Sequence, residues 1–149
     1  MQVSDILRVK GGTLYTVTPQ ESMAQAVQTM AEFDIGSLAV MDGGRLVGML
    51  TFREVMKTLS ANAGAVGATT VGDVMDAQPM HCAPSTELEH VRPLMLEKHT
   101  RYMPVMDGGV LMGVISFYDV AKAVVDSQNF ENQMLKAYIR DWPEKEASA

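Results

Sequence analysis

The sequence contains two copies of a motif in which a hydroxyl residue precedes a carboxylate by three positions, each directly after an apolar segment. The second copy, GVISFYDV, contains Ser116 and Asp119, and the first, GMLTFREV, contains Thr51 and Glu54. This spacing is typical of a helix N-terminus, where the hydroxyl accepts a backbone N–H and the carboxylate favours the helix dipole. The same place offers N–H groups to a phosphate, so helix capping and anion binding are both compatible with it.

Few other residues suggest chemistry. His81 and Cys82 are adjacent, but neighbours on a strand point to opposite faces, so a structural or slot-lining role is favoured over a joint metal or thiol site. His90 and His99 lie on a separate expected helix and at its exit. No activated nucleophile, carboxylate pair or metal cluster is evident in the sequence, so we expect neither an enzyme nor a metal site.

The composition is that of a soluble globular protein. The chain has 149 residues and 47% apolar content, enough to bury a core. Its formal charge of −6 argues against a nucleic-acid partner, because such proteins usually display a basic face. A single cysteine excludes an internal disulfide. With no signal-like start or membrane-spanning apolar stretch, we expect a cytoplasmic protein without membrane association.

The chain contains an internal repeat. SLAVMDGGRLVGMLTFREV aligns without a gap with YMPVMDGGVLMGVISFYDV, and VSDIL near the start resembles VGDVM at 71–75. The pattern of each unit predicts a short strand, a helix, a hairpin with an Asp-Gly-Gly turn and a last helix. This last helix is expected to begin at about residue 52 in the first unit and at about residue 117 in the second. Because the hairpin strands are apolar throughout, we expect each sheet to be covered on both faces.

These patterns predict an α/β (α+β) fold of two βαββα repeats related by a pseudo-twofold axis, with sheets packed centrally and helices outside. Residues 1–60 form the first repeat, 61–70 a small polar linker, 71–126 the second repeat, and 127–149 a C-terminal helix and disordered tail. The tail helix has an apolar face and is expected to end at Pro143. It could pack against its own body or against a second copy.

The duplication, the hairpins and the two Gly-x-x-[Thr/Ser]-x-x-[Asp/Glu] motifs together resemble a tandem pair of CBS (cystathionine β-synthase) domains, a Bateman module, over roughly residues 3 to 126. The resemblance implies two clefts that bind adenosine-containing ligands such as AMP, ADP, ATP, NAD or S-adenosylmethionine, and pairing into disc-like dimers. We therefore expect a non-enzymatic, stand-alone regulatory or signalling module with no obligatory cofactor. AMP is the first candidate ligand, ahead of ATP, ADP and NAD.

The resemblance also implies roles for individual residues. Ser116 would contact the phosphate side of the ligand, and Asp119 would accept both ribose hydroxyls. In the first motif Thr51 matches, whereas Glu54 is longer and is expected to carry its carboxylate about 1.3 to 1.5 Å further out, which disfavours ribose binding. The base slot expected in the second repeat consists of Met80, His81, Cys82, Tyr102, Met103, Pro104 and Ile115. Its counterpart in the first repeat consists of Tyr15, Thr16, Val17, Ser37, Leu38, Ala39 and Leu50.

A phosphate needs a cation, and the acidic chain offers few. Arg101, just before a hairpin strand, is the first candidate, and Arg53, inside the first motif, is the second. Either arginine could equally be a solvated surface residue. The alternative function is a structural interaction or dimerisation module whose clefts are filled by side chains such as Met49, Met80 and Met103 and bind no nucleotide.

Overall fold

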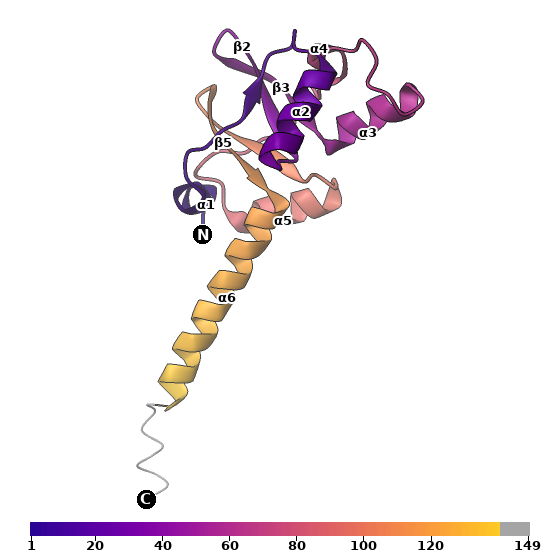
Figure 1. Ribbon diagram of the computed structural model, residues 1–149. Helices are drawn as coiled ribbons and strands as arrows, with labels where there is room; N and C mark the ends of the chain where they lie inside the picture. The colour runs from indigo at the N-terminus through magenta and orange to yellow at the C-terminus, as the bar shows by residue number, and fades with distance from the viewer. Residues whose placement is uncertain (141–149) are drawn as a thin grey trace, which may run out of the picture.

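A computed structural model of the protein describes residues 1–140 (Figure 1). The first half contains α1 (Val3–Lys10), β1 (Thr16–Val17), α2 (Met23–Phe33), β2 (Ser37–Asp42), β3 (Arg45–Thr51) and α3 (Phe52–Ala61). The second half contains α4 (Val71–Val74), α5 (Leu88–Glu97), β4 (Tyr102–Asp107), β5 (Val110–Ser116) and α6 (Phe117–Arg140). The predicted α/β fold of two repeats is confirmed, with a short helix added before each repeat.

Two equivalent hairpins form the centre of the fold. β2 pairs antiparallel with β3, β4 pairs antiparallel with β5, and both ladders shift register at the same place, after Val40 and after Val105. β1 adds a parallel strand beside β2. In the second repeat the expected short first strand, around residues 80–83, is reduced to one bridge between Cys82 and Val105. Pro79 and Pro84 flank this segment and lack the N–H that a longer ladder needs.

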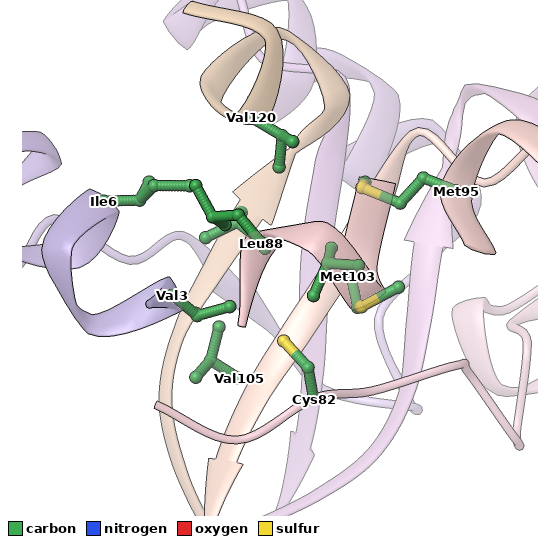
Figure 2. Close-up of a cluster of buried hydrophobic side chains, with 10 residues drawn as sticks. Val3, Ile6, Cys82, Leu88, Met95, Met103, Val105 and Val120 are labelled. Carbon is green, nitrogen blue, oxygen red and sulfur yellow. The ribbon is translucent and has the colours of Figure 1, made fainter. Parts of the chain in front are cut away.

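Each leading helix packs on the opposite repeat. Val3 and Ile6 of α1 are buried with Leu88 and Val105 in the core of the second repeat (Figure 2). Val71 of α4 is buried in the core of the first repeat. The spatial division of the molecule therefore differs from the division of its sequence, because residues 3–10 belong to the second core and 71–74 to the first.

Hydrogen bonds and a close approach hold α1 in this position. The Val3 N–H donates to the Thr86 carbonyl at 2.9 Å. Leu7 lies over Gly113 of β5, where an added Cβ would come within 2.8 Å of the leucine Cδ2 atom. A side chain at position 113 would therefore require the Leu7 side chain to move.

The last helix continues through the boundary expected at residue 127. α6 is a single helix of 24 residues, and the sequence from 117 to 140 contains no glycine or proline that could end it. Val120 is completely buried, whereas Phe130 is 63% exposed and Ile139 is 63% exposed. Figure 1 shows the far half of α6 extending away from the body of the molecule.

The apolar face predicted for the tail is thus present but does not pack on the described body of the chain. The exposed side chains on the far half of α6 are Phe130, Met134, Leu135, Tyr138 and Ile139. The helix end expected at Pro143 and the disorder expected for 144–149 lie outside the described residues. Among residues 1–140, no helix combines the length and the apolarity needed to cross a membrane.

Candidate ligand-binding clefts

Two cavities lie between the repeats, each beside one of the two hydroxyl–carboxylate motifs. The first cleft, of about 420 Å³, is lined by Thr51 and Arg53 of the first motif and by Met80, Arg101 and Tyr102 of the second repeat. The second cleft, of about 950 Å³, is lined by Ser116 and Phe117 of the second motif. Its opposite wall comes from the first repeat and includes Tyr15, Ser37 and Ala39, and Lys10 of α1 also lines it. Each cleft therefore needs both repeats.

The same backbone hydrogen bond positions the two motifs. The Phe52 N–H donates to the Gly36 carbonyl at 3.2 Å, and the Phe117 N–H donates to the Arg101 carbonyl at 2.7 Å. These bonds hold each helix N-terminus beside the start of its hairpin. Gly36 also lies against Tyr102 of the other repeat, where a Cβ would collide with the phenol.

The second motif forms the expected helix cap. The Ser116 N–H donates to Asp119 Oδ2 at 2.8 Å, and the Asp119 N–H donates to Ser116 Oγ at 3.0 Å. This reciprocal pair fixes the carboxylate at the N-terminus of α6. The helix cap predicted for Ser116 and Asp119 is confirmed, and their contact with a ligand stays a prediction.

A lysine that the sequence did not suggest also binds Asp119. Lys10 Nζ donates to Asp119 Oδ2 at 2.7 Å and to the Val114 carbonyl at 2.8 Å. The lysine side chain is 37% exposed and that of Asp119 only 19%. Lys10 lies 109 positions before Asp119 and reaches it only because α1 packs on the second repeat. No local pattern in the sequence could have revealed this pair.

The pKa of Asp119 reflects competing effects. Burial by itself would raise the pKa of this carboxyl group. The hydrogen bond from Lys10, the backbone hydrogen bond from Ser116 and the positive charge of Lys10 outweigh burial and hold the pKa below its ordinary value. Asp119 is therefore an ionised acceptor at neutral pH.

Glu54 of the first motif behaves differently from the expectation. Its Oε1 atom accepts from the Thr51 N–H at 2.7 Å and from the Thr51 hydroxyl at 2.8 Å, and the residue is 8% exposed. The expected outward displacement of this carboxylate is wrong, because the extra methylene lets the side chain fold back onto both donors of Thr51. Glu54 is thus occupied by its own helix cap.

The walls expected for the two base slots are exchanged. The second motif faces Tyr15, Ser37 and Ala39 of the first repeat, and the first motif faces Met80 and Tyr102 of the second. The family resemblance assigns each motif the wall of its own repeat, because a single sequence does not show how the two repeats pack. The contacts of these residues with a ligand stay predictions.

Several residues expected in the slots line neither of these clefts. Val17, Leu38 and Leu50 are buried in the first core, and Cys82, Met103 and Ile115 in the second. Alternate strand residues point inward, which places these side chains away from the cavities. Thr16, His81 and Pro104 are also absent from both linings. Burial raises the pKa of the Cys82 thiol to about 11, as expected of an unreactive core cysteine.

The candidate cations divide unequally between the clefts. Arg101 lines both cavities, whereas Arg53 lines the first and donates from Nη2 to the His99 carbonyl at 3.0 Å. Lys57, one turn after Arg53 on α3, also lines the first cleft and was missed by the sequence reasoning. Among residues 1–140, no group of three or more His, Cys, Asp or Glu side chains is placed to hold a metal ion.

The alternative in which methionine side chains fill both clefts is not observed among residues 1–140. Met49 and Met80 line the first cleft, but Met103 is buried in the core at 1% exposure. The second cleft has none of these three methionines in its lining. Both cavities remain open between the repeats.

Two α/β repeats with clefts at their junction define a tandem-repeat α/β module. The family model of the CBS domain matches residues 3–61 and again 71–126, so the chain belongs to the CBS domain family and carries two copies of the domain.

Relatives of known sequence or structure share this organisation. The chain is 29% identical over 147 residues to the mitochondrial CBS domain-containing protein CBSX3 of Arabidopsis thaliana, covering 93% of this chain and 71% of that protein. It is 35% identical to a protein with CBS domains from Burkholderia ambifaria, with a TM-score of 0.79 and coverage of 86% and 96% of the two chains. It is 28% identical to CBSX2, solved in complex with AMP, with a TM-score of 0.71 and coverage of 85% and 98%.

Proposed function

We propose that the protein is a non-enzymatic regulatory module that binds an adenosine-containing ligand in the second cleft. The observation that carries the proposal is the Ser116–Asp119 cap. Ser116, at the N-terminus of α6, lines the cavity of about 950 Å³, and Asp119, which accepts from the Ser116 N–H, lines a cavity of about 470 Å³ that shares Lys10 and Tyr118 with it. A ribose can donate two hydroxyl groups to such a carboxylate, and a phosphate can accept from the N-terminus of α6. The AMP complex of CBSX2 supports the ligand class.

Lys10 adds a step to binding in this cleft. In the described structure its amino group occupies Asp119 Oδ2, one of the oxygens that ribose hydroxyls would use. A ligand that reaches Asp119 replaces this contact, and Lys10, which also lines the second cleft, can then turn to the ligand's phosphate. After this exchange the positive charge of Lys10 still lies near two anionic groups, the carboxylate of Asp119 and the phosphate of the ligand. This limits the electrostatic cost of the exchange.

AMP is the first candidate, followed by ATP, ADP and NAD. A monophosphate fits the two cations of the second cleft, Lys10 and Arg101, better than a longer phosphate chain would. Since the cleft has walls from both repeats, a bound ligand would favour one relative orientation of the repeats. This differential affinity is the means by which occupancy could be passed to a protein partner.

Isothermal titration calorimetry of the full chain with AMP, ADP, ATP, NAD and S-adenosylmethionine tests the proposal. Asp119→Asn keeps the size of the side chain and removes its charge, and it should weaken binding at least about tenfold, as expected for loss of a charged hydrogen bond. The matched control is Asp107→Asn in the hairpin turn, which should bind as the wild type does. The proposal fails if none of the ligands binds, or if Asp119→Asn and the control bind equally well.

We further propose that the protein is a cytoplasmic homodimer that acts on a protein partner not yet identified. The exposed apolar side chains on the far half of α6 support an assembly surface. The same surface also favours the alternative function, a dimerisation or interaction module that binds no nucleotide. Absence of ligand binding together with a stable dimer would select that alternative.

A further inference from the structure

The far half of α6 continues the side with which the helix packs on the body. Val120 is completely buried in the second core, and Val124 follows one turn later. Steps of three and four residues lead on from Val124 to Met134, which is 59% exposed. Within residues 1–140, the packing side of α6 therefore extends past the part of the body that covers it.

Charge is unevenly distributed along this half of the helix. Between residues 126 and 140 the charged residues are Asp126 and Glu131, followed by Lys136 and Arg140. A second copy of α6 in antiparallel orientation sets the acidic part of each helix beside the basic part of the other, and it also opposes the two helix dipoles. A second copy in parallel orientation would set like charges beside each other.

Glu131 limits what can cover the apolar face. It lies three residues before Met134 and four before Leu135, so its carboxylate is on the face itself. A lipid surface disfavours this position, because a helix that lies on a membrane keeps its charges on the face turned to water. A parallel second copy would bring two Glu131 carboxylates together among apolar side chains. An antiparallel second copy avoids both costs.

The spacing of the exposed apolar residues also fits an antiparallel pair. Their midpoint lies between Met134 and Leu135, and Phe130 and Ile139 are equally far from it on either side. In an antiparallel pair that crosses at this midpoint, Phe130 of one copy lies at the level of Ile139 of the other. The apolar stretch of each helix is then covered by the apolar stretch of the other over its whole length.

We propose that the far half of α6 pairs antiparallel with the far half of α6 in a second copy. In this pair Glu131 of each copy lies between the levels of Lys136 and Arg140 of the other, about 3 Å along the axis from each. The two bodies lie at opposite ends of the helix pair (Figure 1), unlike the bodies of a disc-like dimer, which pair directly. The inference rests on the proposed homodimer and names its paired element and orientation. It does not depend on ligand binding in either cleft.

Pulsed electron paramagnetic resonance of the full chain, with a nitroxide attached at Lys122→Cys, measures the orientation. The side chain at this position is 55% exposed. Residue 122 lies about 12 positions before the midpoint, so the two labels of an antiparallel pair should be about 37 Å apart along the axis. In a parallel pair they should be less than about 20 Å apart, since paired helices lie 8–10 Å from each other. Wild-type protein is the labelling control, because its one cysteine, Cys82, is buried.

Sedimentation equilibrium measures the contribution of the charges to dimerisation. Glu131→Lys and Lys136→Glu should each weaken the dimer at least about fivefold, because each sets like charges together at two symmetric places. The double variant restores opposite charges and should dimerise within about twofold of the wild type. The matched control is Glu32→Lys, a charge reversal at an exposed position of α2, which should change the dissociation constant less than about twofold.

The outcomes separate the inference from the proposed function. A label separation below about 20 Å, or a double variant that dimerises no better than the single variants, overturns the antiparallel pair and leaves the homodimer standing. A monomeric wild-type chain overturns both, and cosedimentation with vesicles of phosphatidylcholine and phosphatidylglycerol then tells whether lipid covers the face instead. Calorimetry with AMP tests the cleft independently of all these results. Circular dichroism checks that each variant is folded.

Discussion

Replacing Lys10 by methionine removes the contact that ties α1 to the second motif. The substitution keeps an unbranched side chain and deletes an amino group that lies 2.7 Å from Asp119 Oδ2 and 2.8 Å from the Val114 carbonyl. Exposed ion pairs contribute about 0.2 to 1 kcal/mol, and the upper value applies here because the carboxylate is mostly covered. We expect the free energy of unfolding at pH 7 to fall by about 1 kcal/mol.

The stability lost in Lys10→Met depends on pH, because Lys10 pairs only with the ionised form of Asp119. The folded-state pKa of Asp119 lies below the ordinary value of 3.8, so its stabilising contribution is present above that value. The contribution is lost as the pH falls through the folded-state pKa, because the protonated carboxyl no longer pairs with Lys10. The stability difference between wild type and Lys10→Met should therefore shrink in acid.

Urea unfolding of both proteins at pH 7 and at successively lower pH measures this difference. The control is Lys122→Met, whose amino group lies 3.8 Å from Asp126 with both side chains more than half exposed. The reasoning is refuted if Lys10→Met is no less stable than Lys122→Met at pH 7, or if its deficit is unchanged in acid.

Three further predictions concern packing, reactivity and assembly. Gly36→Ala should lower the free energy of unfolding by about 1 to 3 kcal/mol, because its Cβ would collide with the aromatic side chains of Tyr102 and Phe52. Urea unfolding measures this against the control Gly12→Ala, whose Cβ meets no neighbouring atom and should not cause this loss. Cys82 should react slowly with a thiol reagent at pH 8 in the native protein and rapidly in denaturant, because burial raises its pKa to about 11; equal rates would contradict this. Phe130→Glu combined with Met134→Glu should convert a dimer into a monomer in light scattering without lowering the stability of the body, and an unchanged mass would exclude this face of α6 from the interface.

Local patterns in the sequence predicted the local parts of the fold. The two hairpins followed from apolar runs around Asp-Gly-Gly, and the caps followed from the spacing of Ser116 to Asp119 and of Thr51 to Glu54. These features depend on neighbouring residues, so a single sequence contains the necessary information. The family model then matched the same two repeats.

The parts that escaped prediction depend on contacts between distant segments. The packing of α1 on the second repeat brings Lys10 to Asp119, and the packing of the hairpins assigns each motif a wall from the other repeat. Neither follows from periodicity or spacing. Glu54 is a different case, because Thr-x-x-Glu is itself a capping box and its closed form could have been inferred from the local sequence.

The uninterrupted α6 has a mechanical consequence. At a rise of about 1.5 Å per residue, its 24 residues form a rod about 36 Å long whose first turn carries the second motif. A tilt of about 5° at that turn would displace the opposite end by about 3 Å, since a helix without glycine or proline transmits rotation along its length. The far half of α6 would then amplify small movements at the cleft into displacements large enough for another protein to detect.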